Sequence, residues 1–83
     1  MTDTAATLTP GQVVLKVLGQ TLAARELEID QSTVWRWAQP KPKGSGGIVP
    51  ARHHARLIEI ARTHRKRLTA ADLVHGRKVA ADA

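Results

Sequence analysis

The chain contains no cysteine among its 83 residues. This absence excludes disulfide bonds, thiolate zinc sites and thiol nucleophiles, and it is typical of a protein that works in the reducing cytoplasm. Phenylalanine and tyrosine are also absent, and no apolar run is long enough for a membrane-spanning helix or for the hydrophobic part of a secretory signal. We therefore expect a soluble, cytoplasmic protein that does not bind a membrane.

The length of the chain allows one small domain with a modest core. A core of this size leaves little room for a deep cleft with supporting residues around it. The sequence has no glycine loop of the phosphate-binding type and no nucleophile motif, and its histidines lack the i, i+4 spacing of a helical metal site. We therefore expect a binding module that is not an enzyme and that uses no metal, cofactor or small-molecule substrate.

Acidic residues are in the minority, since 13 Lys and Arg stand against 7 Asp and Glu, which gives a net charge of +6. Nearly all of the excess lies between Arg36 and Arg67, where Glu59 is the only acidic residue, whereas residues 1–30 are net negative. Such an excess favours a polyanionic partner. A membrane-bound helix would show a broad apolar face with aromatic anchors, so nucleic acid is the expected polyanion.

Helix signals divide the chain into five short helices. Capping-box patterns begin the first helix at Thr9 and the last at Thr69, Asp30 stands where its carboxylate can cap the third, and Pro50 opens the fourth. Each helix carries apolar residues at helical spacing that can face a common core. The expected helices span residues 10–18, 20–28, 31–38, 51–66 and about 70–75.

The remaining segments show no such pattern. Residues 1–8 are small and polar, residues 77–83 follow a glycine, and residues 41–47 combine proline and glycines with two lysines. We therefore predict an all-α, five-helix domain over residues 9–76. A flexible N-terminal arm (1–8), a mobile basic loop (41–47) and a flexible C-terminal tail (77–83) complete the expected organisation.

The stretch from Gln20 to Gln39 is typical of a helix-turn-helix, in which two short helices meet at a tight turn. Ala24 supplies the small side chain needed where the helices touch. Apolar residues stand at the positions that must point inward, namely Leu27, Ile29, Val34 and Trp37. The opposite face of the second helix would contact DNA bases through Gln31, Ser32, Trp35 and Arg36.

The segment QTLAARELEIDQSTVWRW, residues 20–37, resembles the helix-turn-helix of the Cro/C1-type regulators of phages and prophages. The later Ile48-Val49-Pro50-Ala51 is similar to the start of the fourth helix in all-helical Cro proteins and YdaS-like antitoxins. The resemblance covers about residues 10–75. It implies a Cro-like fold, major-groove contacts by the four residues named above, a phosphate contact at Gln20 and a two-fold dimer.

Two positions depart from the family pattern. Glu28 stands in the turn where the family usually has glycine, and a left-handed backbone at another residue costs about 1 kcal/mol. Trp35 stands where a small or polar residue is common. Its indole could contact a thymine methyl group or a sugar, pack under the fourth helix, or lie at a dimer contact. Arg36 suits guanine or a phosphate, with a solvated surface arginine as the alternative.

Other polar and basic side chains are expected to contact DNA phosphates, namely Gln20, Thr33, Lys41, Lys43, Arg52 and Arg56. The basic face of the fourth helix, with Arg52, Arg56 and Lys66, could instead serve solubility alone, because the sequence does not show on which side of the domain it lies. For a dimer contact we expect the last helix and the tail, which offer apolar surface at Leu73, Val74 and Val79.

These features predict a sequence-specific regulator of transcription that binds double-stranded DNA as a homodimer on an inverted repeat and represses by covering a promoter. One alternative is an antitoxin or anti-regulator whose main partner is a protein and whose DNA binding serves autoregulation. Another is an architectural DNA-coating or RNA-binding protein. Such proteins rely on bare basic surface, stacking aromatics or minor-groove wedges more than on a shaped helix.

Overall fold

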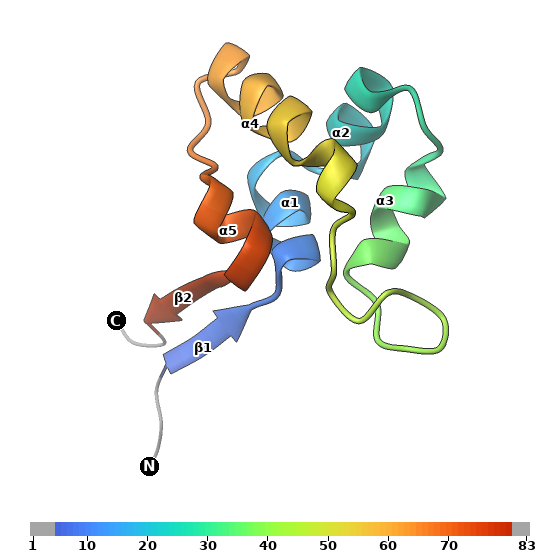
Figure 1. The fold of residues 1–83 in the computed structure, drawn as a ribbon, viewed down its shortest axis with the longest axis vertical. Helices are drawn as coiled ribbons and strands as arrows, with labels where there is room; N and C mark the ends of the chain where they lie inside the picture. Colours follow the sequence, from blue (N-terminus) through green and yellow to red (C-terminus); the bar gives the residue numbers. More distant parts are fainter. Residues whose placement is uncertain (1–4, 81–83) are drawn as a thin grey trace.

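The computed structural model describes the backbone of residues 5–80 and the side chains of residues 7–77. The described chain is mostly helical, as predicted, and α1 lies at the centre with α2 and α3 on one side and α5 on the other (Figure 1). None of its helices is both long and apolar enough to span a membrane. The five α-helices are α1 (Pro10–Val17), α2 (Gln20–Leu27), α3 (Gln31–Trp37), α4 (His54–Thr63) and α5 (Ala70–His75).

Helices α1 and α5 begin with the predicted capping boxes. Thr9 Oγ1 accepts a hydrogen bond from the Gln12 N–H at 3.2 Å, and the Gln12 side chain accepts one from the Thr9 N–H at 2.9 Å. Thr69 and Asp72 make the same exchange at α5. Asp30 is the N-cap residue of α3, as predicted, but its carboxylate accepts no capping hydrogen bond within the described residues. Its charge can still interact favourably with the helix dipole.

The fourth helix is shorter than predicted at both ends. Residues Ala51–His53 form a 3₁₀ turn, η1, before α4 begins at His54. At the other end Arg65 adopts a left-handed backbone with φ of 58°, and the Lys66 N–H donates to the carbonyl oxygen of Ala61 at 2.7 Å. This pattern closes the helix without the glycine that usually marks such an end. The sequence therefore gave no signal for a stop at Thr63.

The two ends of the described chain form an antiparallel pair of strands that the sequence did not predict (Figure 1). Strand β1 (Ala5–Leu8) pairs with β2 (Arg77–Ala80), with Ala5 opposite Ala80 and Leu8 opposite Arg77. The predictions of a flexible arm and a flexible tail are therefore wrong over residues 5–8 and 77–80, and they fall outside the described residues at 1–4 and 81–83. The domain extends beyond the predicted limits of 9–76 because each strand finds its partner at the other end of the chain.

An ion pair fixes the start of β2 against α5. The Arg77 guanidinium donates two hydrogen bonds to the Asp72 carboxylate, at 2.6 and 3.2 Å, and one to the carbonyl oxygen of Arg67 at 2.9 Å. The hydrogen bond from Arg77 is the main cause that lowers the pKa of Asp72, and the backbone hydrogen bond from Thr69 adds to it against the opposing effect of burial. Asp72 is buried, so its negative charge depends on these partners.

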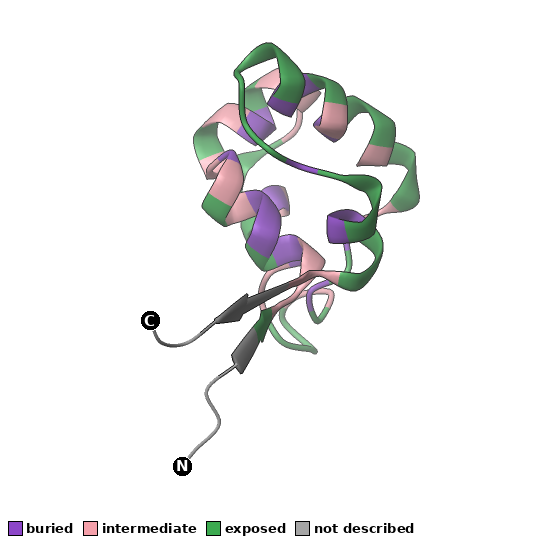
Figure 2. Cartoon of the chain, turned by 90° about the vertical axis from the view of Figure 1, so that its left-hand side faces the viewer, coloured by how far each residue is buried: buried purple, intermediate pink, exposed green. Residues whose placement is uncertain are grey.

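The hydrophobic core lies between α1 and the surrounding helices, with the exposed residues on the outside (Figure 2). Its largest fully buried side chains are Leu57, Ile60, Leu73, Val13, Val14 and Val34. Because Leu73 belongs to this core, the prediction that it offers a dimer surface is wrong. Val74 is 58% exposed and remains available, whereas the side chain of Val79 lies outside the described residues.

Trp37 joins α3 to η1 inside the domain. Its ring is 4% exposed, and its centroid lies 5.5 Å from the centroid of the His53 imidazole. Burial, followed by the nearby charges of Arg52 and His54, lowers the pKa of His53. The neutral imidazole is thereby favoured beside the indole, and the predicted inward position of Trp37 is confirmed.

Candidate nucleic-acid interface

Helices α2 and α3 are joined by a tight turn of Glu28, Ile29 and Asp30. Glu28 adopts the left-handed backbone with φ of 58° and ψ of 46°, although it is not a glycine. The Ile29 N–H donates to the carbonyl oxygen of Ala24 at 3.0 Å, which closes the end of α2. The left-handed backbone of Glu28 costs about 1 kcal/mol. It allows the short connection by which α3 crosses α2.

Apolar contacts fix which side of α3 faces the core. Val34 is fully buried and Ala24 is 2% exposed where α2 and α3 meet. Leu27 and Ile29 are partly buried against the same core. The prediction that these apolar residues point inward is therefore confirmed. Their burial determines which side of α3 faces the solvent.

The opposite side of α3 is exposed along its whole length. Two rows of side chains lie on it at i, i+4 spacing, Gln31 with Trp35 and Ser32 with Arg36. Trp35 is 43% exposed, and α4 packs mainly against α2, η1 and α5, so the alternative that Trp35 packs under the fourth helix is wrong within the monomer. Thr33 is half-buried at the flank of this face. We call the four exposed side chains the α3 face.

The start of α2 touches the start of α3. Gln20 Nε2 and Thr21 Oγ1 each lie 3.5 Å from Gln31 Oε1 and form long hydrogen bonds with it. These contacts engage the amide oxygen of Gln31. Gly19, which precedes α2, has no side chain to cap the first N–H groups of the helix. Those N–H groups and Gln20 can together bind an anion next to the α3 face.

Thr21 was not singled out from the sequence. Its contact with Gln31 joins residues ten positions apart and depends on how α2 and α3 cross. The available signal was its place immediately after Gln20, in the first turn of a helix that begins beside α3. The structure thus adds Thr21 to the candidate site as a residue that orients Gln31.

The segment after α3 is a loop without helix or strand, as predicted, and hydrogen bonds connect it to its neighbours. The Ser45 N–H donates to the carbonyl oxygen of Arg36 at 3.1 Å, and the Gly46 N–H donates to that of Gln39 at 2.9 Å. The Ser45 hydroxyl donates to the carbonyl oxygen of Ile48 at 2.6 Å, and the carbonyl oxygen of Trp37 lies 3.3 Å from the same hydroxyl. The loop therefore satisfies carbonyl groups at the C-terminal end of α3.

Glycines allow this loop to approach its neighbours closely. The Gly11 N–H donates to the carbonyl oxygen of Gly47 at 2.8 Å, which ties the loop to the first turn of α1. A Cβ atom on Gly44 would overlap the carbonyl oxygen of Arg36, and one on Gly47 would overlap the Thr9 side chain. Lys41 and Lys43 are exposed on this loop. Both lysines therefore lie on the loop that directly follows α3.

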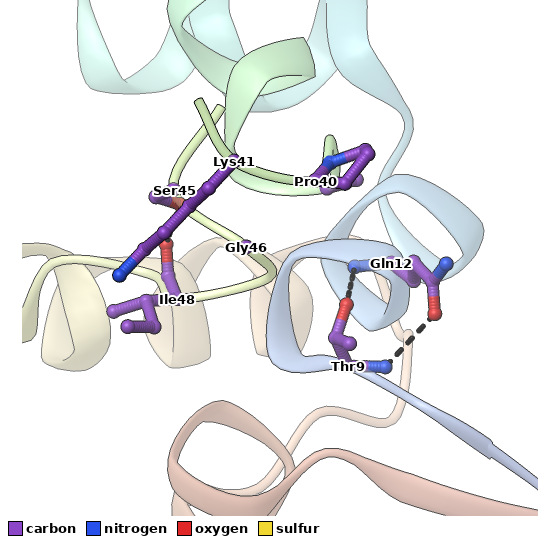
Figure 3. A pocket seen from close by; sticks show the side chains of 8 residues that line it. Thr9, Gln12, Pro40, Lys41, Ser45, Gly46 and Ile48 are labelled. Atoms are coloured by element: carbon purple, nitrogen blue, oxygen red, sulfur yellow. Dashed lines mark hydrogen bonds between the residues drawn. The ribbon is translucent and has the colours of Figure 1, made fainter. Parts of the chain in front are cut away.

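An open hollow of about 620 Å³ lies between this loop and the first turn of α1 (Figure 3). Figure 3 shows the Lys41 side chain running past Ser45 toward Ile48 on one side of the hollow, with Thr9 and Gln12 on the other. Its lining is largely apolar, and Lys41 is its one charged lining residue among those the structure describes. The hollow therefore lacks a pair of groups suited to acid–base catalysis within the described chain.

Helix α4, which carries Arg56, packs mainly against α2, η1 and α5. Helix α2 packs against both α3 and α4 and stands between them (Figure 1). Arg56 forms ion pairs with Glu59 at 2.9 Å and with Glu26 of α2 at 3.8 Å, which reduces the charge it offers to a ligand. Arg52 is exposed on η1, next to the inward-facing contact of His53 with Trp37. Phosphate contacts by Arg52 and Arg56 remain predictions.

The comparisons with protein-family models, with curated proteins and with solved structures give no match for this chain. Among the described residues, no three His, Asp or Glu side chains gather into a group that could hold a metal ion. The candidate site for a ligand on the described surface is therefore the α3 face. The start of α2, which has no side-chain cap, lies beside it, and the loop with the exposed Lys41 and Lys43 follows it.

Proposed function

We propose that the protein is a sequence-specific, double-stranded DNA-binding regulator of transcription that inserts α3 into the major groove. The α3 face carries this proposal, because its polar and aromatic side chains point outward from a helix that the core holds in one rotation. The major groove is about 12 Å wide and admits an α-helix. The α2–turn–α3 unit matches a helix-turn-helix in its short connection and its exposed second helix, which supports a Cro-like domain.

The chemistry of the side chains suits this role. Arg36 can donate two hydrogen bonds to guanine O6 and N7, and the exposed amide of Gln31 can form hydrogen bonds with a base edge. The first N–H groups of α2, with Gln20, can bind one phosphate, and Lys41 and Lys43 can bind others beyond the end of α3. The net charge of +6 favours the encounter with DNA.

The regulator is proposed to act as a homodimer on an inverted repeat. One α3 face offers four base-reading side chains, and at about 1 to 3 kcal/mol per good contact a single copy rarely reaches specific affinity. A two-fold dimer doubles the contacts and spaces the two α3 helices by about 34 Å, one turn of DNA. Covering a promoter in this way would repress transcription.

The proposal is tested by selection from a pool of random double-stranded DNA. We expect the wild-type protein to enrich an inverted repeat. The double variant Gln31→Ala/Ser32→Ala should lose this preference, because both residues lie in the first turn of α3, while it keeps its helical circular dichroism and its weak binding to any DNA. The variant Arg62→Ala, which changes an exposed residue of α4, serves as the control and should select the wild-type sequence.

Two results would contradict the proposal. Equal affinity of the wild type for scrambled and selected DNA would favour an architectural protein that coats DNA. Full sequence preference in the Gln31→Ala/Ser32→Ala variant would show that another surface reads the bases.

A further inference from the structure

Trp35 gives the α3 face an apolar surface that the fold itself does not use. The side chain is 43% exposed, whereas Trp37, two residues further along the same helix, is 4% exposed and packs on His53. Core packing therefore accounts for Trp37 and leaves Trp35 unexplained. A large exposed aromatic side chain between polar neighbours is typical of a contact surface.

The position of Trp35 restricts what it can contact on DNA. It lies one helical turn after Gln31 and next to Arg36, so any duplex bound by these two residues also meets the indole. In the major groove the base edges present hydrogen-bond donors and acceptors and a single kind of apolar group, the C5-methyl group of thymine. Covering the polar groups of another base with the indole would desolvate them without compensation.

Thymine also suits the polar end of the indole. Its O4 atom is an acceptor on the same base edge as the methyl group, and the indole Nε1–H is a donor. An indole that packs on the methyl group can therefore also satisfy its N–H. No other base edge in the groove offers both features together.

The geometry of α3 predicts where this thymine lies. Residues four apart on a helix are separated by about 6 Å along its axis, and successive base pairs are separated by about 3.4 Å. For a helix that follows the groove, Trp35 then meets a base pair about two steps from the one that Gln31 contacts. Resting on the proposed function, we propose that Trp35 reads the C5-methyl group of one thymine in each half-site, about two base pairs from the contact of Gln31.

The test uses the DNA site selected by the wild-type protein. Each thymine is replaced in turn by deoxyuridine, which keeps the base pair and O4 but lacks the methyl group. We expect one position in each half-site at which the replacement weakens binding by about fourfold, the usual effect of one buried methyl group. This position should lie about two base pairs from the one at which Gln31→Ala relaxes the sequence preference.

Variants of the protein then assign the effect to Trp35. The variant Trp35→Ala should bind the thymine and deoxyuridine sites equally, whereas Trp35→Leu should retain part of the difference because it is still apolar. The variant Arg62→Ala, which changes an exposed residue of α4 outside the α3 face, is the control and should keep the full difference. Circular dichroism should be unchanged in all three variants, since both positions are exposed.

The outcomes separate this inference from the function on which it rests. If the wild type selects a DNA site but binds thymine and deoxyuridine equally at every position, the inference is wrong and the proposed function stands. The same conclusion follows if Trp35→Ala keeps the fourfold difference, or if it only changes the oligomeric state in sedimentation. If the wild type selects no sequence, the proposed function fails and the inference fails with it.

Discussion

A single carboxylate, that of Asp72, connects three separate parts of the chain. It accepts a hydrogen bond from the Thr69 N–H at the start of α5 and binds the guanidinium of Arg77 at the start of β2. Through Arg77 it also reaches the carbonyl oxygen of Arg67, just before α5. Because Asp72 is buried, removing its cationic partner would leave a charge with poor solvation.

This ion pair predicts how stability depends on pH. The pKa of Asp72 is lowered in the folded protein, chiefly by the hydrogen bond from Arg77, relative to an unfolded value of about 3.9. A lowered folded pKa means that the pair stabilises the fold above the unfolded value. That contribution is lost as the pH falls from about 4 through the folded pKa.

The variant Arg77→Met should reduce the free energy of unfolding at pH 7 by about 1.5 to 3 kcal/mol, the usual contribution of a hydrogen bond to a charged group. The difference from wild type should shrink as the pH falls below about 4, because Asp72 is then protonated first in the unfolded state and, below its lowered folded pKa, in the folded state as well. Urea unfolding at a series of pH values measures it, with Arg62→Met as the control. A difference that stays constant to the lowest pH would show that Arg77 acts through its contact with Arg67 and not through the Asp72 charge.

At the scale of elements, a turn precedes α3 and a hydrogen-bonded loop follows it. The sequence predicts the turn better than it predicts the loop. The turn before α3 follows from the helix signals on either side, whereas a left-handed Glu28 was suggested only by the resemblance to the Cro/C1-type regulators. The loop after α3 does not follow from such signals. Its shape depends on hydrogen bonds to the α3 carbonyl groups and on the contact of Gly11 with Gly47, which joins segments 36 residues apart, from 11 to 47. Proline and glycine in the sequence indicated only that no helix forms there.

The hydrogen-bonded loop after α3 carries Lys41 and Lys43, which we expect to contact DNA phosphates. Replacing both by alanine should flatten the slope of log K against log salt by about 3 for a dimer, because up to four phosphate contacts are lost, while the selected sequence stays the same. The variant Lys16→Ala/Arg62→Ala removes the same charge from exposed positions on α1 and α4 and is the matched control. Binding measured from low to moderate salt gives both slopes.

Two other results of this experiment are informative. An unchanged slope in the Lys41→Ala/Lys43→Ala variant would mean that the loop does not touch DNA, and the phosphate contacts would have to be sought at Arg52. A changed sequence preference would mean that the loop reads bases.

For the whole molecule, periodicity and capping patterns were enough to predict five helices and the outward face of α3. They act over a few residues, so they are visible in the sequence. The pairing of β1 with β2 was not visible, because strands of four residues are too short to show a pattern and gain their stability from a distant partner. The ion pair of Arg56 with Glu26 was missed for the same reason, since it joins α4 to α2.

The register of the strand pair brings the two ends of the described chain together, with Ala5 opposite Ala80. Neighbouring antiparallel strands lie about 4.8 Å apart, a gap that a two-residue turn such as Asn-Gly can close. The protein is therefore suited to circular permutation. A turn that joins Ala80 to Ala5 would convert the strand pair into a β-hairpin, and new ends could open between Lys66 and Arg67, both exposed between α4 and α5.

We expect the permuted chain to keep the helical circular dichroism and the DNA site of the natural order, since no contact of the α3 face crosses the new break. Thermal melting and selection from random DNA would check this expectation, and a permuted chain that fails to fold would refute it. A folded permuted chain would mean that the order in which the elements are synthesised is not needed for the fold. It would also mean that the fold does not need the peptide bond between α4 and α5 once a turn joins β2 to β1.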